Sequence, residues 1–303
     1  MEGYKNKVVL VTGGTGSIGS EIVRQLLKSN VRQVRVYSRD EHKQFELKQE
    51  LGEDDRVRYL IGDIRDKDRL DFAFKGVDIC FHAAALKHVP ICEYNPFEAV
   101  KTNIVGTQNV IDISIKHNIE KMVAVSSDKA VSPESVLGAS KLMMERLVIA
   151  SSSIIGPGRT RFAAVRFGNV LHSRGSVMHT WKKQIDAGGP VTVTDKRMVR
   201  FFMEIPEAVQ LIFDAAALMQ GGEIFVLKMP THVVHELAHK LIEKHAPGKK
   251  IDIVYTGLRP GEKLEEALFT KEEMAHMEET EHMYIIRSLA QVTPEDKRAR
   301  KES

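Results

Sequence analysis

The sequence predicts an α/β fold, a doubly wound parallel sheet with a smaller mixed α/β unit. Two observations predict the sheet: short apolar runs alternate with amphipathic segments through the first half of the chain, and a glycine-rich turn follows the first run. Buried strands that alternate with helices form right-handed βαβ units, which build such a sheet. The smaller unit is predicted because this alternation stops after about residue 167.

Short apolar runs in the first half are the expected strands of the sheet. They cover residues 8–12, 33–37, 57–61, 77–82, 121–127 and 161–167. A continuous apolar run is typical of a strand that is buried on both faces. The intervening segments, such as 17–29 and 96–118, place apolar residues at helical spacing.

The second half of the chain has a different rhythm. Residues 168–200 are polar and rich in glycine, whereas 202–219 indicate a helix with Pro206 near its start, and 223–228 indicate a strand. We assign residues 1–167 and about 201–228 to the first domain. The second domain takes about 168–200 and 229–290, and residues 291–303 form a charged tail.

Composition argues against several classes of function. Lys and Arg number 44 and Asp and Glu 41, and the formal charge of +3 is too small for a dedicated nucleic-acid surface. No run approaches the roughly 18 apolar residues of a membrane span, and no signal-peptide pattern opens the chain. Cys80 and Cys92 lack metal-ligand spacing and fit a reducing, cytoplasmic setting. We therefore expect a cytoplasmic protein without a metal site.

The glycine-rich turn lies in VVLVTGGTGSIGSEIVRQLL, between the first expected strand and the first expected helix. Glycines at 13, 16 and 19 permit a tight turn, a close approach of the backbone to a pyrophosphate, and close packing of helix on strand. This placement predicts a Rossmann-type dinucleotide site. Its GxxGxxG spacing resembles that of the short-chain dehydrogenase/reductases. The expected contacts of this turn are Gly13, Thr15, Gly16, Ser17, Ile18 and Gly19.

The tip of the second expected strand favours NADP over NAD. An NAD site commonly places a carboxylate there, but this chain has Ser38 and Arg39, with Lys43 one turn further on. Guanidinium and ammonium groups suit a 2′-phosphate. Further cofactor contacts are expected after the third strand, at Asp63 and Ile64, and after the fourth, at Ala83, Ala84 and Ala85.

The stretch SSDKAVSPESVLGASK (126–141) follows the fifth expected strand and ends in Lys141, on what we expect to be the first turn of a helix. In short-chain dehydrogenases this lysine follows a catalytic tyrosine by four residues, which puts both on one helix face. Here the tyrosine position holds Leu137, which cannot transfer a proton. Asp128 and Lys129 offer an acid and an amine instead, beside Ser127.

SSDKAVSPESVLGASKLMMERL, RFGNVLHSRGSV and GLRPGEKLEE together resemble the UDP-N-acetylglucosamine 4,6-dehydratases, a polysaccharide-biosynthesis branch of the extended short-chain dehydrogenases. The resemblance covers about residue 5 to about 287. A retaining branch of that family has methionine in place of the tyrosine and still dehydrates. Leu137 resembles this branch, with one apolar side chain in place of another of similar size.

The resemblance also implies where a UDP-sugar binds, in the second domain beside an NADP-binding first domain. Asn169 can hydrogen-bond diphosphate or sugar oxygens, and arginines offer guanidinium forks to a pyrophosphate. The implied substrate residues are Lys87, His88, Asn169, Arg200, Arg259 and Glu262. Members of the family self-associate, so a homo-oligomer is expected as well.

The resemblance implies a mechanism with four catalytic residues, Ser127, Asp128, Lys129 and Lys141. NADP⁺ oxidises C4 of UDP-N-acetylglucosamine, Lys129 removes the C5 proton, and Asp128 protonates the departing C6 hydroxyl. Asp128, or a water relayed through Ser127, would deprotonate the C4 hydroxyl. The alternatives are a 5-epimerising dehydratase, a UDP-sugar 4-reductase or epimerase, and a non-catalytic NADP-binding sensor, which Leu137 alone supports.

Overall fold

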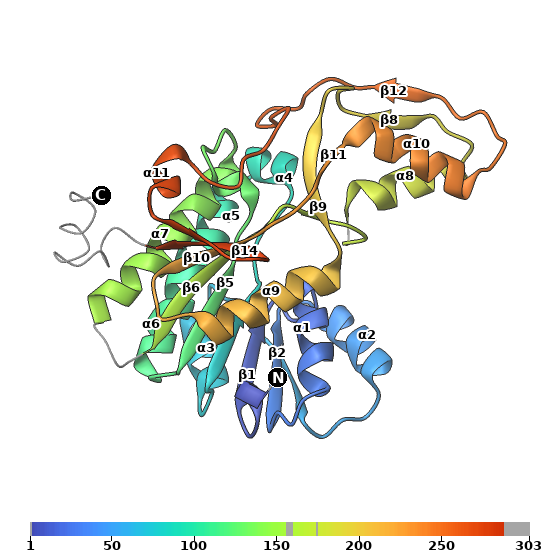
Figure 1. The fold of residues 1–303 in the computed structure, drawn as a ribbon. Helices are drawn as coiled ribbons and strands as arrows, with labels where there is room; N and C mark the ends of the chain where they lie inside the picture. The colour runs from blue at the N-terminus through green and yellow to red at the C-terminus, as the bar shows by residue number, and fades with distance from the viewer. Residues whose placement is uncertain (1, 156–159, 174, 288–303) are drawn as a thin grey trace.

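We describe the fold from a computed structural model, which covers residues 2–155, 160–173 and 175–287. The expected tail (291–303) and the last residues of the second expected domain lie outside the described residues. Within the described residues, nine strands form one sheet in the order β13-β14-β10-β6-β5-β4-β1-β2-β3 (Figure 1). The strands of this sheet are β1 (Val8–Thr12), β2 (Gln33–Ser38), β3 (Val57–Ile61), β4 (Ile79–His82), β5 (Lys121–Val125), β6 (Arg161–Arg166), β10 (Glu223–Leu227), β13 (Met277–Glu279) and β14 (Met283–Arg287).

Strand pairing in this sheet is parallel from β3 across to β10, and only β13 and β14 run antiparallel to their neighbours. All five residues of β1 are buried, as are all four of β4. Continuous burial of this kind follows when helices cover both faces of a sheet. The predicted doubly wound parallel α/β class is therefore confirmed.

Helices cover both faces of the sheet. One face carries α1 (Ser17–Leu27), α2 (Glu41–Leu51) and α9 (Ile205–Leu218), and the other carries α3 (Lys67–Phe74), α6 (Gly106–Lys116) and α7 (Val136–Ile155). The shorter helical segments are η1 (Glu2–Tyr4), which precedes β1, and α4 (Val89–Tyr94), α5 (Pro96–Ala99), η2 (Val100–Val105), η3 (Asp128–Ala130) and α11 (Lys271–Met274), which lie between the longer elements.

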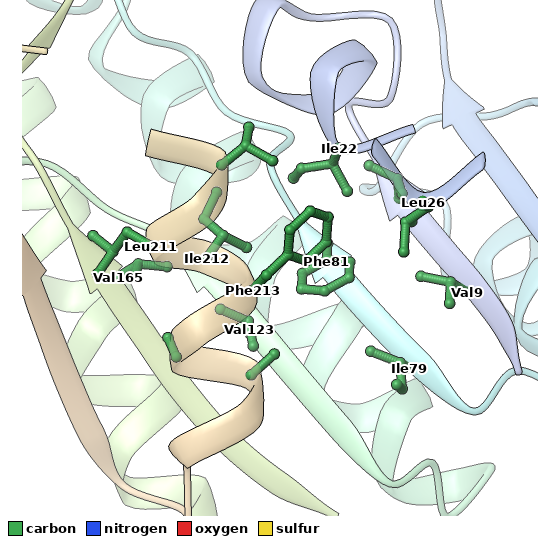
Figure 2. Packing of buried hydrophobic residues seen from close by; sticks show 14 of the residues in the cluster. Val9, Ile22, Leu26, Ile79, Phe81, Val123, Val165, Leu211, Ile212 and Phe213 are labelled. Atoms are coloured by element: carbon green, nitrogen blue, oxygen red, sulfur yellow. The ribbon is translucent and has the colours of Figure 1, made fainter. Parts of the chain in front are cut away.

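Aromatic contacts fix α9 against the centre of the sheet (Figure 2). Phe213 of α9 meets Phe81 of β4 edge to face, with ring centroids 5.6 Å apart, and Tyr4 packs on Phe213 at 5.3 Å. Such edge-to-face pairs add to the stabilisation that burial itself provides. The helix expected over 202–219 begins three residues later, at Ile205, because 202–203 belong to β9 and Glu204 and Glu207 form a capping box. Pro206 lies in its first turn, as predicted.

The chain between β6 and α9, together with the segment from β11 to β12, builds a smaller mixed α/β part. It contains a sheet of β7 (Asn169–Val170), β9 (Val199–Met203) and β11 (Thr231–Val233), and a strand pair of β8 (Val191–Val193) with β12 (Ile253–Tyr255). Helices α8 (Val177–Asp186) and α10 (Val234–His245) complete it (Figure 1). Its apolar cluster surrounds the fully buried Trp181. The domain boundaries stay a prediction.

Two local expectations need correction at the tip of the fifth strand. The strand expected over 121–127 ends at Val125, because Ser127 caps η3 by accepting a hydrogen bond from the Lys129 amide. Lys141 was expected in the first helical turn. Because α7 begins at Val136, Lys141 is its sixth residue and lies in the second turn.

Candidate active site

A cleft of about 1320 Å³ lies at the carboxyl ends of the parallel strands and extends to the smaller mixed part. Open α/β sheets bind ligands at this edge. Most predicted site residues line this cleft, and Asp63, Ile64 and Ala84 line an adjoining cavity of about 170 Å³. Asp128 lines neither of these two cavities. The predicted residues along the cleft wall are Gly13, Thr15, Gly16, Ser17, Ile18, Gly19, Ser38, Arg39, Lys43, Ala83, Ala85, Lys87, His88, Ser127, Lys129, Lys141, Asn169, Arg200, Arg259 and Glu262.

The glycine-rich turn is tight enough to exclude side chains. Gly13 has a φ of +65°, and a Cβ there would lie 2.7 Å from the Ala84 nitrogen. A Cβ on Gly19 would lie 2.3 Å from the Gly13 oxygen, so the helix packs directly on the turn. Gly16 precedes α1 and provides no side-chain cap for it. This geometry fits a dinucleotide whose pyrophosphate meets the N-terminus of α1.

The cations expected to hold a 2′-phosphate already have carboxylate neighbours. Arg39 Nη1 lies 3.5 Å from Asp63 Oδ2, and Lys43 forms an ion pair with Asp40. Ser38 exchanges a 2.8 Å hydrogen bond with Thr15. Both side chains of the expected phosphate site are partly exposed, at 56% for Arg39 and 44% for Lys43, so a bound phosphate can reach them.

Asp63 is held by a neighbouring arginine. Arg65 Nη2 donates to Asp63 Oδ2 at 2.7 Å, and its amide donates to Oδ1 at 3.0 Å. Burial opposes ionisation, but these hydrogen bonds outweigh it and hold the pKa of Asp63 below its ordinary value. The side chain therefore remains an acceptor at neutral pH, as contact with an adenine amino group requires.

Lys141 is buried at the foot of the cleft. Its Nζ donates to the Val125 carbonyl at 2.8 Å, and burial lowers the pKa of Lys141 to about 8. Leu137, one turn earlier, is 3% exposed and packs with Cys92 and Ala99. Leu137 also lines the cleft, so an apolar surface stands where a phenol would be expected.

Asp128 and Lys129 form one polar cluster with Ser127 and Asn169. Lys129 Nζ lies 3.0 Å from Asp128 Oδ1 and 3.1 Å from Asn169 Oδ1, and Ser127 Oγ donates to Asp128 Oδ1 at 2.8 Å. Asp128 is fully buried, and its Oδ2 has no hydrogen-bond partner among the described residues. Ser127 and Lys129 line the cleft, whereas Asp128 does not and lies beneath these two residues, which it contacts.

Glu266 is a member of this cluster that the sequence reasoning missed. Its Oε1 lies 3.8 Å from Lys129 Nζ, and it lines the cleft although its side chain is only 5% exposed. Burial raises the pKa of Glu266. The only available signal was its place in GEKLEE after Arg259. Nothing in that motif indicates contact with a lysine 137 residues earlier in the chain.

The expected substrate residues line the cleft and differ in burial and in their hydrogen-bond and ion-pair partners. His88 precedes α4, and burial lowers the pKa of both Lys87 and His88. Arg259 pairs with Glu262 three residues later. Arg200 is 6% exposed, and its guanidinium donates to the backbone carbonyls of residues 199, 263 and 264. Those hydrogen bonds hold the 263–264 segment in place.

Comparison with known proteins identifies the family. Residues 9–288 match the family model described as Polysaccharide biosynthesis protein, so the chain belongs to that family. A protein of Methanocaldococcus jannaschii named as an uncharacterized membrane protein is 53% identical, over 93% of this chain and 86% of its own length. A UDP-N-acetylglucosamine 4,6-dehydratase (inverting) of Campylobacter jejuni is 42% identical, and a UDP-glucose 4-epimerase of Rickettsia prowazekii is 39% identical; each match covers 93% of this chain and 83% of the relative.

Solved structures share the fold. Pen from Bacillus thuringiensis superposes with a TM-score of 0.92 at 45% identity, over 95% of this chain and 91% of that one. The dTDP-glucose 4,6-dehydratase DesIV of Streptomyces venezuelae, solved with NAD bound, has a TM-score of 0.78 at 23% identity, over 97% and 95%. The second likeness supports the Rossmann-type fold and no more.

The described residues also bear on membrane and metal-binding sites. None of the helices in residues 2–155, 160–173 and 175–287 is long and apolar enough to cross a membrane. The same ranges hold no group of three or more His, Cys, Asp or Glu residues that could bind a metal ion. Cys80 and Cys92 are both buried and unpaired with each other.

Proposed function

We propose that the protein is a UDP-N-acetylglucosamine 4,6-dehydratase of the configuration-retaining type, with NADP as its cofactor. The observation that carries this proposal is the contact of Lys129 with Asp128 and Asn169 at the cleft wall, while Leu137 fills the tyrosine position. An amine and a carboxyl beside one ligand suit an elimination, which needs a base for a C–H proton and an acid for the departing hydroxyl.

The cofactor would lie along the glycine-rich turn, with its adenine end beside Asp63 and its nicotinamide ribose beside Lys141. When bound, NADP supplies reversible hydride transfer, which oxidises C4 of the sugar and later reduces C6. The tight contacts of Gly13 and Gly19 leave room for a pyrophosphate and not for side chains. Arg39 and Lys43 would hold the 2′-phosphate in exchange for part of their present pairing with carboxylates.

The residues at the strand tip would move the protons. Ser127 faces the cleft and contacts Asp128, so the C4 hydroxyl can lose its proton to Asp128 through the serine hydroxyl. Lys129 then takes the C5 proton, which the C4 carbonyl has made acidic. Asp128, now protonated, returns its proton through Ser127 to the C6 hydroxyl, which leaves as water. The proton on Lys129 goes back to C5 on its original face.

Product analysis tests this proposal. The full chain with NADP and UDP-N-acetylglucosamine in D₂O should give a 4-keto-6-deoxy sugar with deuterium at C5 and the original C5 configuration by proton NMR. Asp128→Asn and Lys129→Met should still bind NADP but lose at least about 100-fold in product formation. Lys67→Met, which removes an exposed lysine of α3, is the matched control and should retain turnover. Near-native turnover in either cluster variant would refute the assigned roles.

Two alternative products are favoured by particular relatives. Inverted configuration at C5 would make the protein an inverting dehydratase, the activity named for the relative from Campylobacter jejuni. A C4 epimer without water loss would indicate an epimerase, the activity named for the relative from Rickettsia prowazekii. Tight NADP binding with no product from any UDP-hexosamine would indicate a sensor.

Cofactor choice has its own test. Arg39→Ala should weaken NADP binding about tenfold and leave NAD binding nearly unchanged, because only NADP carries the 2′-phosphate. Isothermal titration with both cofactors measures this difference. Equal losses for the two cofactors would show that Arg39 does not contact that phosphate.

A further inference from the structure

One carboxylate in the polar cluster has no part in the proposed mechanism. Glu266 lies in the loop after β12, and its carboxyl group reaches to 3.8 Å from Lys129 Nζ. Its Oε2 is buried without a hydrogen-bond partner among the described residues. A buried carboxylate oxygen that accepts no hydrogen bond is costly, so the placement of this carboxyl group between the ammonium groups of Lys129 and Lys263 needs a physical reason.

We propose that Glu266 is a positioning residue that sets the protonation state of the Lys129 amine in the elimination step. This inference rests on the proposed function, because it assigns Glu266 a part in that reaction. Glu266 acts through Lys129 and needs no contact with substrate.

The surroundings of the Lys129 amine support this assignment. Three oxygens from three separate segments approach its Nζ: Asp128 Oδ1 at 3.0 Å, Asn169 Oδ1 at 3.1 Å and Glu266 Oε1 at 3.8 Å. An ammonium has three N–H donors, and a neutral amine has two and a lone pair. When Lys129 loses a proton, its Nζ can donate to only two of these three oxygens. The contact with Glu266 is the longest of the three.

Charged groups from every neighbouring segment face Glu266. Asp128 and Lys129 come from the strand tip, Arg200 from β9, and Lys263 from the same loop, with its Nζ 3.8 Å from Glu266 Oε2. Lys263 Nζ donates to the carbonyls of residues 131 and 132, and Arg200 donates to three backbone carbonyls. Lys129 thus lines the cleft and also lies beside a carboxylate oxygen of Glu266.

The charge on Glu266 decides how readily Lys129 releases a proton. An anionic Glu266 favours the ammonium, and a neutral Glu266 favours the amine. Burial raises the pKa of Glu266, and the negative charge of Asp128 acts in the same direction, whereas Lys129 opposes both. Glu266 therefore changes charge at a higher pH than an exposed glutamate does.

Chemical labelling of the Lys129 amine tests the inference. The full chain is treated with an acylating reagent across a pH series, and modification of Lys129 is followed by peptide mass spectrometry. Glu266→Gln keeps the shape and removes the charge, so half-maximal labelling should move to lower pH by at least about one unit, a tenfold change in the fraction of free amine. Glu265→Gln is the matched control, because Glu265 is the adjacent carboxylate and is exposed. Its labelling curve should coincide with that of the wild type.

A rescue variant and a rate profile complete the test. Glu266→Asp restores the charge and should return the labelling curve toward that of the wild type. The pH dependence of keto-sugar formation in Glu266→Gln should move in the same direction as its labelling curve. An unshifted labelling curve in Glu266→Gln overturns the inference even if activity falls. Because labelling needs no turnover, failure of the wild type to form a keto sugar would refute the proposed function separately.

Discussion

Replacement of Lys141 by methionine should stabilise the protein at neutral pH while it weakens cofactor binding. The lysine is 6% exposed, and its burial lowers the pKa from 10.5 to about 8. At 1.36 kcal/mol for each pH unit, the charged form costs about 3 kcal/mol in the folded state. The variant also loses the hydrogen bond to the Val125 carbonyl, which costs about 1 kcal/mol. A net gain of about 2 kcal/mol is expected at pH 7.

The stability difference between the wild type and Lys141→Met should also depend on pH. The folded pKa of Lys141 lies below its unfolded value, so between about pH 8 and 10.5 the unfolded chain binds the extra proton. Wild-type stability should therefore rise relative to the variant across this window, and the advantage of the variant should vanish by about pH 10.5. Urea denaturation of both proteins at pH 7 and about pH 10.5 measures the expected advantage and its loss.

The control and the refuting result are equally specific. Lys67→Met removes an exposed lysine that pairs with Asp112, and its stability should change by less than about 1 kcal/mol at either pH. If Lys141→Met proves less stable than the wild type at pH 7, or if its advantage persists at pH 10.5, burial of the charge is not the dominant cost at this position.

Two further substitutions test the fold around the site. Arg166→Met should destabilise the protein by about 3–5 kcal/mol in urea denaturation, because it leaves the buried carboxylates of Glu145 and Glu273 without their cation, and a loss under about 1 kcal/mol would contradict this. Gly19→Ala should reduce NADP affinity in isothermal titration at least tenfold, because its Cβ would lie 2.3 Å from the Gly13 oxygen; unchanged affinity would show that the turn relaxes freely.

The sheet was predictable from sequence because it depends on local patterns. Short, mainly apolar runs such as 8–12 and 57–61 coincide with β1 and β3 to the residue. The end of the fifth strand was wrong by two residues, because a side-chain cap at Ser127 turns the chain into η3. The pattern of apolar residues does not predict a side-chain cap of this kind.

The candidate site was predictable in its location but not in its contacts. The order of strand tips places Arg39, Lys129 and Lys141 along one cleft, and the structure has them there. That Arg200 donates to backbone carbonyls, and that Glu266 approaches Lys129, depends on how a distant loop crosses the cleft. No local pattern in the sequence encodes these long-range pairings.

The buried guanidinium of Arg166 gives the site a shared anchor. It contacts Glu145 one turn beyond Lys141 on α7, the Leu268 carbonyl just after Glu266, and Glu273. The amine that would face the nicotinamide ribose and the carboxylate beside Lys129 are thus tied to the same interior cation. A shift of Arg166 would therefore displace groups that serve both the oxidation and the water loss of the proposed reaction, although Arg166 lines neither of the two cavities.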